Sequence, residues 1–222
     1  MSSGKHFHNV LCLSEAKGMD IIMRIIGITG GVGSGKSQVL SFMKERYGAV
    51  ICQADQVAWK LQEPGCVCYE KIVAHFGTEI LREDRTINRG ILGEIVFGNA
   101  EEMAVLNGIV HPEVKAYIKE QIVTEKKIGT SCFVLEAALL LEDHYDEICH
   151  ELWYIYTEES IRRIRLKQSR GYSDEKISAM IASQMPENVF RQKCQVLINN
   201  SNSFEMTQRE IEKAMNRQEK RK

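Results

Sequence analysis

The feature that most constrains this chain is a glycine-rich loop between an apolar run and a helical pattern. Residues 24–29, Arg-Ile-Ile-Gly-Ile-Thr, are apolar and β-branched, which predicts a buried strand. Residues 38–47 have helical spacing and stop before Gly48. Between them, residues 30–37 read Gly-Gly-Val-Gly-Ser-Gly-Lys-Ser and satisfy the pattern G-x-x-x-x-G-K-S/T. A strand, this loop and a helix in that order predict a binding site for nucleoside triphosphate phosphates.

Each residue type in the loop contributes to phosphate binding. Glycines permit positive φ angles and close approach of the backbone, so successive N–H groups form an anion nest at a helix N-terminus. The ammonium of Lys36 can reach the β- and γ-phosphates, and the hydroxyl of Ser37 can ligate Mg²⁺. A glycine-rich turn without a ligand is the alternative, and the placement between strand and helix argues against it. The predicted ATP-binding residues are Gly31, Val32, Gly33, Ser34, Gly35, Lys36, Ser37 and Gln38.

Four further apolar runs predict strands, and helical patterns separate them. These strands are expected at residues 49–52, 131–135, 151–156 and 196–198. Helices are expected at residues 56–62, over most of 69–128, at 158–169 and 174–185, and at the C-terminus. Pro112 is expected to open a helix of its own. Strands that alternate with helices predict an α/β fold with a parallel sheet covered on both faces.

Bulk composition excludes several classes of protein. A chain of 222 residues can bury one sizeable core with a small appended subdomain. The net charge of −1 gives no electrostatic reason to expect nucleic acid as a partner. No apolar stretch approaches the roughly 18–20 residues of a membrane span, so no membrane partner is expected. Residues 1–22 are rich in Ser, Gly and His. We expect them to be a disordered extension or the result of a start codon assigned too far upstream, with an amphipathic extension as the alternative.

Seven cysteines, an odd number, are spread along the chain without a Cys-x-x-Cys pair. Several lie in apolar runs, which indicates reduced and mostly buried thiols in a cytoplasmic protein. Cys66, Cys68 and His75 would be a conceivable metal site, but their spacing fits no common zinc pattern.

An acid after the second strand narrows the class of phosphate-loop protein. The chain lacks the Asp-x-x-Gly and Asn-Lys-x-Asp motifs of GTPases and the Ser-Gly-Gly segment of transporter ATPases, which favours ATP over GTP. Asp55 instead ends the second predicted strand, and in a parallel sheet that end lies beside the phosphate loop. Asp55 could accept a proton from an attacking hydroxyl or hold a Mg²⁺-bound water. The alternative is an N-cap for residues 56–62.

The segment 162–170 carries five cations in nine residues. A solvated helix face is the usual meaning of such a run. A mobile basic lid that closes over ATP is the alternative, because arginines can offset charge on a transferred phosphoryl group.

The motifs taken together, from about residue 24 to 215, resemble those of the dephospho-CoA kinase family. The motifs that carry the resemblance are residues 28–37, Ala54-Asp55-Gln56, Glu63-Pro64-Gly65, Phe76-Gly77, Asn88-Arg89 with Leu92 and Val96-Phe97, His111-Pro112, Leu139-Leu140 with Glu142, Gln184 and Asn199-Asn200. The departures are Gln38 for Thr, Gln53 for an acid, Ala138 for Pro, and Cys194-Gln195 for Ala-Asp.

The resemblance implies a P-loop NTPase-type three-layer fold over residues 23–222, with a five-stranded parallel sheet, a helical acceptor-binding subdomain at 69–128 and a helical lid at about 158–186. It implies phosphorylation by ATP, with Mg²⁺, of the ribose 3′-hydroxyl of dephospho-CoA. ATP and dephospho-CoA are then the partners, and we expect a monomer or weak homo-oligomer. Alternatives are another P-loop kinase, for a nucleoside, nucleotide or shikimate-like alcohol, and a nucleotide-binding protein without turnover.

The resemblance also implies roles for particular residues. Lys36, Asp55 and Arg170 would be catalytic, with Arg165 the next candidate among the lid arginines. Ser37 would ligate Mg²⁺. Asp55, Arg89 and His111 would contact the acceptor, although His111 could instead be a packed histidine at a helix start.

Overall fold

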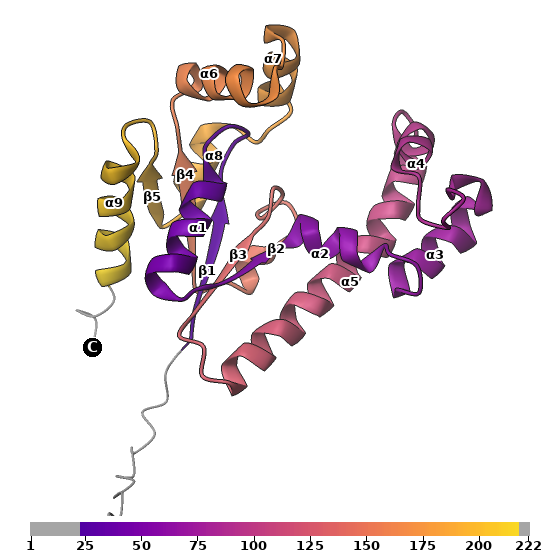
Figure 1. The fold of residues 1–222 in the computed structure, drawn as a ribbon, viewed down its shortest axis with the longest axis horizontal. Helices are drawn as coiled ribbons and strands as arrows, with labels where there is room; N and C mark the ends of the chain where they lie inside the picture. Colours follow the sequence, from indigo (N-terminus) through magenta and orange to yellow (C-terminus); the bar gives the residue numbers. More distant parts are fainter. Residues whose placement is uncertain (1–22, 218–222) are drawn as a thin grey trace, which may run out of the picture.

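A single parallel sheet organises the molecule. The computed structural model describes residues 23–217, and its strands lie in the order β2-β3-β1-β4-β5 (Figure 1). Every pairing is parallel, which confirms the predicted five-stranded parallel sheet. The strands are β1 Arg24–Thr29, β2 Val50–Gln53, β3 Cys132–Glu136, β4 Glu151–Tyr156 and β5 Val196–Asn199. Each lies within one or two residues of its predicted range.

Helices cover both faces of the sheet because each strand carries apolar side chains on both faces. Ile25 of β1 joins a core formed with α2 to α5, whereas its neighbour Ile26 joins a second core formed with α1 and α9. This alternation follows from the period of two along a strand. The helices are α1 Lys36–Tyr47, α2 Ala54–Leu61, α3 Val67–Phe76, α4 Arg89–Val96, α5 Ala100–Lys127, α6 Glu159–Arg170, α7 Asp174–Ala182, α8 Glu187–Lys193 and α9 Phe204–Asn216. The predicted three-layer α/β architecture is confirmed.

Helix α5 corrects one prediction. Pro112 does not open a helix but lies inside α5, which continues unbroken for 28 residues. A proline inside a helix removes one backbone hydrogen bond and crowds the carbonyl four residues earlier. Buried residues at a spacing of four (Val110, Val114, Ile118 and Ile122) run through this region and pack into the core. Tertiary packing of that stripe therefore offsets the local cost of the proline.

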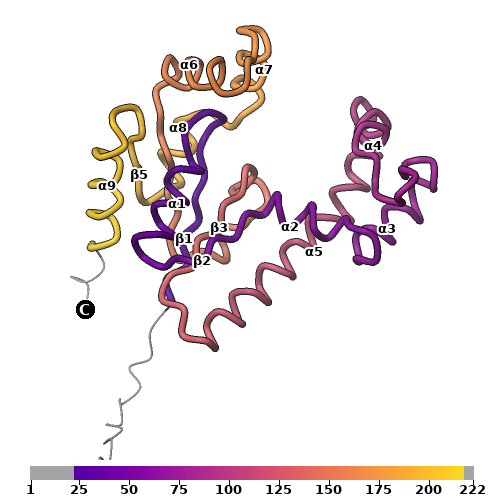
Figure 2. Tube along the Cα trace, in the orientation of Figure 1, coloured from indigo at the N-terminus to yellow at the C-terminus, as the bar shows by residue number. Residues whose placement is uncertain are grey.

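Two groups of helices stand away from the sheet. Helices α3 and α4 pack around the end of α5 that points away from the sheet, and α6 with α7 lies above the loop that follows β1 (Figures 1 and 2). The helix expected at 174–185 ends at Ala182, and the short helix α8 that follows was not predicted. Helix α8 is fixed by buried Phe190, whose ring stacks on Tyr154 at a centroid distance of 4.9 Å.

Within residues 23–217 the cysteines behave as expected. Cys52, Cys68 and Cys132 are buried, and all six described cysteines are free thiols. Burial raises the pKa of Cys52 to about 11, which keeps it protonated and unreactive. The described part of the chain holds no cluster of three metal-ligating side chains, so Cys66 and His75 form no such site there. None of its helices combines the length and apolarity needed to cross a membrane. The predictions for residues 1–22 lie outside the described residues.

Candidate active site

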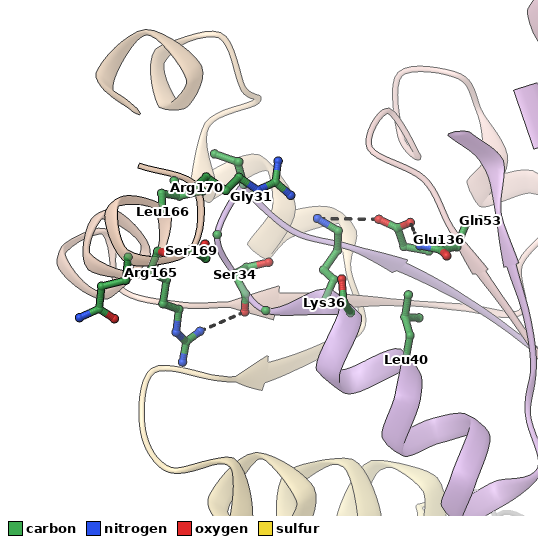
Figure 3. Close-up of a pocket in the computed structure, with 15 residues that line it drawn as sticks. Gly31, Ser34, Lys36, Leu40, Gln53, Glu136, Arg165, Leu166, Ser169 and Arg170 are labelled. Carbon is green, nitrogen blue, oxygen red and sulfur yellow. Dashed lines mark hydrogen bonds and ion pairs between the residues drawn. The ribbon is translucent and has the colours of Figure 1, made fainter. Parts of the chain in front are cut away.

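The glycine-rich loop forms one wall of a large cavity. Gly33 and Gly35 adopt φ values of 76° and 81°, which side-chain-bearing residues rarely adopt, so the loop curls around its own N–H groups. The cavity has a volume of about 720 Å³ and lies between this loop and α6 (Figure 3). Its lining comprises residues 31–37, Leu40, Gln53, Glu136, Arg165, Leu166, Gln168, Ser169 and Arg170. Gln38 is exposed on α1 and is absent from this lining.

Some loop N–H groups are already bound within the protein. Val32 donates its N–H to the side-chain oxygen of Gln184 at 3.2 Å, and Ser34 donates its N–H to the carbonyl of Gly31 at 3.1 Å. No acceptor within residues 23–217 takes the N–H groups of Gly33, Gly35, Lys36 or Ser37. These four groups are therefore the donors that the loop offers to a phosphate.

Lys36 faces an acid that sequence reasoning missed. Its ammonium donates to the carbonyl of Gly30 at 2.7 Å and lies 3.8 Å from Oε1 of Glu136 (Figure 3). Glu136 ends β3, is buried, and accepts from the side-chain nitrogen of Gln53 at 3.2 Å. Burial lowers the pKa of Lys36, and the carboxylates of Glu136 and Asp55 act in the opposite direction. The two acids therefore help to keep the lysine charged.

The carbonyl of Ser34 anchors the outer side of the loop. It accepts hydrogen bonds from the hydroxyl of Thr157 at 3.0 Å, the side-chain nitrogen of Asn200 at 2.8 Å and Arg165 at 3.4 Å. Asn200 is buried, and its own side-chain oxygen accepts from Thr207 at 2.9 Å. Segments after β4 and β5 thus fix the loop from behind, leaving its free N–H groups facing the cavity.

Asp55 lies in the first turn of α2, directly after β2. The helix begins at Ala54, and its N-cap position is Gln53, so the alternative that Asp55 is an N-cap is wrong. Asp55 is exposed and shares a cavity of about 100 Å³ with His111 of α5. Nδ1 of His111 lies 3.1 Å from a carboxylate oxygen of Asp143. Two of the predicted acceptor-side residues, Asp55 and His111, are therefore brought together.

Arg89 lies in a different cavity from Asp55. Its guanidinium carbon lies 4.6 Å from the ring centroid of Trp59, a cation–π contact. Trp59 follows Asp55 by four residues on α2, so the two side chains lie on the same helix face, one turn apart. Trp59 and Arg89 line a cavity of about 530 Å³ together with Arg82. One face of α2 thus connects the cavity of Asp55 with that of Arg89.

The basic helix α6 divides its cations between two faces. Arg162 and Arg165 hydrogen-bond to the loop carbonyls of Val32 and Ser34, and Arg170 is exposed at the cavity lining. Arg163 pairs instead with Glu159, and Lys167 with Asp174, on the outer side of the lid. One face of α6 therefore contacts the phosphate loop, and the cations elsewhere on the helix pair with acids.

The sequence also matches the model of a known protein family. The sequence model of dephospho-CoA kinase matches residues 24–206. This chain belongs to the dephospho-CoA kinase family.

Relatives of the chain agree with this family over nearly their full length. The dephospho-CoA kinase of Carboxydothermus hydrogenoformans is 39% identical over 191 residues, which cover 86% of this chain and 92% of the relative. That of Shouchella clausii is 35% identical, covering 86% of this chain and 96% of the relative.

Solved structures agree with the fold. The structure titled TT1252 from Thermus thermophilus has a TM-score of 0.74 at 27% identity, covering 87% of this chain and 96% of the other. The dephospho-CoA kinase from Campylobacter jejuni has a TM-score of 0.64 at 29% identity, covering 86% of this chain and 94% of the other.

In this dephospho-CoA kinase family member, sequence reasoning missed two lining residues that lie near the loop lysine. Glu136 ends a predicted strand at the same sheet edge as Asp55, so the argument that identified Asp55 applied to it as well. Gln53 was noted as a departure in the sequence, and the structure shows its side chain bound to Glu136. Both residues therefore belong to the candidate active site.

Proposed function

We propose that this chain transfers the γ-phosphoryl group of ATP to the 3′-hydroxyl of the ribose of dephospho-CoA, giving CoA and ADP, the last step of coenzyme A synthesis. The observation that carries this proposal is the family match over residues 24–206, in a fold that joins the loop cavity to Asp55 at one sheet edge. Carboxyl ends of parallel strands are where α/β proteins bind ligands.

ATP phosphates would lie along the free N–H groups of the loop. The N–H groups of Gly33, Gly35, Lys36 and Ser37 would hold the β-phosphate, and the ammonium of Lys36 would leave the carbonyl of Gly30 to bridge to the γ-phosphate. Such donors are fixed in the fold before the substrate arrives, so they stabilise charge without reorganisation. Arg170 and Arg165, which line the same cavity, would approach the transferred group from α6.

The donor set also fits Mg²⁺. The hydroxyl of Ser37 is exposed in the first turn of α1, and the carboxylate of Glu136 lines the same cavity. Oxygen ligands of this kind suit a small hard cation that keeps most of its waters. When bound, Mg²⁺ would neutralise charge that develops on the phosphate oxygens.

Asp55 would orient or deprotonate the 3′-hydroxyl for in-line attack. Its exposed carboxylate lies at the edge of the sheet, close enough to Lys36 to raise the pKa of that lysine. The acceptor would then extend along α2 toward Trp59 and Arg89, in the helical subdomain at residues 69–128. His111, held by Asp143 beside Asp55, would contact the ribose side of the acceptor.

The direct test uses the purified full-length chain with ATP, Mg²⁺ and dephospho-CoA, and follows CoA and ADP formation. The expected result is one CoA per ADP, lost in Lys36→Ala and retained in Lys44→Ala, an exposed lysine of the same helix. Turnover of another alcohol without CoA formation, in a screen of nucleosides, nucleotides and shikimate, would overturn the acceptor assignment. Tight ATP binding without any product would overturn the catalytic assignment.

The proposal also covers the cellular location and the oligomeric state of the protein. The free cysteines of the described residues, three of the six buried, suit a reducing cytoplasm. We expect a monomer or weak homo-oligomer, which sedimentation of the purified chain would test.

A further inference from the structure

Two lid residues cover the side of the loop that faces away from the nucleotide cavity. Nε of Arg162 donates to the carbonyl of Val32 at 2.8 Å, and its Nη2 donates to Oε1 of Gln184 at 2.7 Å. The same oxygen of Gln184 accepts the N–H of Val32 at 3.2 Å. Both backbone polar groups of Val32 are thus bound by side chains of the lid.

The two residues come from opposite ends of the lid. Arg162 lies in the first turn of α6, and Gln184 follows α7. They line a separate cavity of about 170 Å³ behind Gly31, and neither is among the residues that line the nucleotide cavity. The direct contacts of Arg162 are therefore with the loop backbone and not with the lining of the nucleotide cavity.

Arg162 occupies the space that a side chain at position 31 would need. The motif leaves this position open, and Gly31 is not among the glycines with positive φ, so its backbone conformation does not require glycine. A Cβ added there would lie 2.5 Å from Nη2, 2.6 Å from Cζ and 2.8 Å from Nη1 of Arg162, which are its three nearest atoms. The guanidinium lies flat against the backbone of Gly31, and any side chain would displace it.

Arg162 also differs electrostatically from its neighbour. Arg163 has an ion pair with Glu159 at 2.8 Å, whereas no carboxylate within residues 23–217 lies within 4.0 Å of Arg162 in an ion pair. Its hydrogen bonds go to neutral oxygens, and its charge is near enough to Lys36 to affect the pKa of that lysine. The guanidinium therefore contacts the phosphate loop without a direct ion pair, although Glu159 and Glu187 line the same small cavity.

We propose that Arg162 and Gln184 form a latch that holds the Gly31–Val32 corner of the loop, making Arg162 a positioning residue for phosphoryl transfer. The inference rests on the kinase activity proposed above. By binding both polar groups of Val32, the latch fixes the direction of the next N–H groups, from Gly33 to Ser37, that face the phosphates. Loosening it misplaces those donors by a fraction of an ångström, which is enough to lower kcat.

The decisive experiment is a double-mutant cycle of Gly31→Ala and Arg162→Gln, with kcat for CoA formation as the readout. Each single variant is expected to lower kcat by about tenfold or more, with the KM for dephospho-CoA unchanged. Because the three atoms nearest to the added methyl group all belong to Arg162, Gly31→Ala should have little further effect once Arg162 is glutamine, and the double variant should match Arg162→Gln alone. Arg163→Gln, which removes the same charge from the outer face, should leave kcat unchanged.

Conservative variants separate geometry from charge. Arg162→Lys keeps the charge but not the planar fork that reaches Val32 and Gln184 together, so it should not restore kcat. Gln184→Leu removes the shared acceptor and should reproduce the Arg162→Gln phenotype even if Gly31→Ala fails to fold. Full activity of Arg162→Lys would reduce the role of Arg162 to simple charge.

A second readout keeps this inference distinct from the proposed function. ADP affinity, measured by calorimetry without any acceptor, should fall about tenfold in Arg162→Gln and show the same lack of additivity with Gly31→Ala. If dephospho-CoA is not phosphorylated at all, the proposed acceptor fails while this cycle still tests the latch. Independent, multiplicative effects of the two substitutions on both readouts, or wild-type values in Arg162→Gln, would overturn the latch.

Discussion

Nζ of Lys36 lies 3.8 Å from Oε1 of Glu136, across the sheet edge where β1 and β3 both end. The lysine is largely removed from water, which lowers its pKa, and Glu136 is the strongest of the groups that raise the pKa again. A lysine is charged below its pKa. The pair therefore decides up to what pH the loop presents an ammonium to ATP.

In Glu136→Gln, activity should be lost at a lower alkaline pH than in the wild type. Without the carboxylate, burial acts on Lys36 with less opposition, so its pKa falls and the charge is lost at a lower pH. We expect the descending limb of kcat/KM for ATP to move to lower pH, because that ratio reports the free enzyme. Glu147→Gln, a surface substitution, is the control. An unmoved alkaline limb in Glu136→Gln would contradict this electrostatic role.

Asp55→Asn should lower kcat on the order of 10²-fold or more while ATP still binds. Asp55 is exposed in the first turn of α2 and makes no N-cap hydrogen bond, so its loss should cost little stability. The measurement combines steady-state CoA formation with calorimetric ATP binding. Glu70→Gln, an exposed acid in the first turn of α3, should retain kcat. An unchanged kcat in Asp55→Asn would remove Asp55 from the catalytic residues.

Trp59 should report acceptor binding through its fluorescence. Of the two tryptophans, Trp153 is fully buried and Trp59 is 55% exposed beneath the guanidinium of Arg89. If the acceptor reaches this cavity, dephospho-CoA should change the emission of the wild type and not that of Trp59→Phe.

Arg89→Gln should raise the KM for dephospho-CoA about tenfold with kcat nearly unchanged, because it removes binding energy and not a reacting group.

The control for this cavity is Arg85→Gln, which removes an exposed cation from the neighbouring loop. A higher KM in both variants would indicate a general effect of surface charge. An effect of Arg89→Gln on kcat alone would contradict the acceptor-binding role of this cavity.

The sheet and the phosphate loop could be predicted because their signals are local. Residues 151–156, all apolar or aromatic after Glu151, form β4 within the expected bounds, and the loop pattern fixes the glycines and Lys36 by spacing alone. Helix α5 could not be predicted as one element, because Pro112 is a strong local breaker. Only the buried stripe from Val110 to Ile122, a tertiary effect, shows why the helix continues.

The lid arginines could be assigned only in part. Leu166 is the buried residue of α6, so Arg162 and Arg170, four positions before and after it, were predictable as its neighbours on one helix face, whereas Arg165, one position earlier, was not. The sequence could not show that Arg162 covers Gly31. Nor could it show that Arg162 and Gln184, 22 residues apart, bind each other and the backbone of Val32. That juxtaposition depends on how the chain returns after α7.

Asn200→Asp should weaken the loop from its outer side. The side-chain nitrogen of Asn200 donates to the carbonyl of Ser34 at 2.8 Å inside the protein, and its oxygen accepts from Thr207. In aspartate of the same shape, an oxygen would face the Ser34 carbonyl. That carbonyl would keep only Thr157 and Arg165 as donors and would meet a repelling charge. We expect a loss of about 1–3 kcal/mol in the free energy of unfolding and a several-fold lower affinity for ADP.

Protonation of the new carboxyl group would supply a donor, so thermal unfolding should show partial recovery of stability as the pH falls, a recovery absent in Asn200→Ala. Wild-type stability and ADP affinity in both variants would show that this contact does not hold the loop.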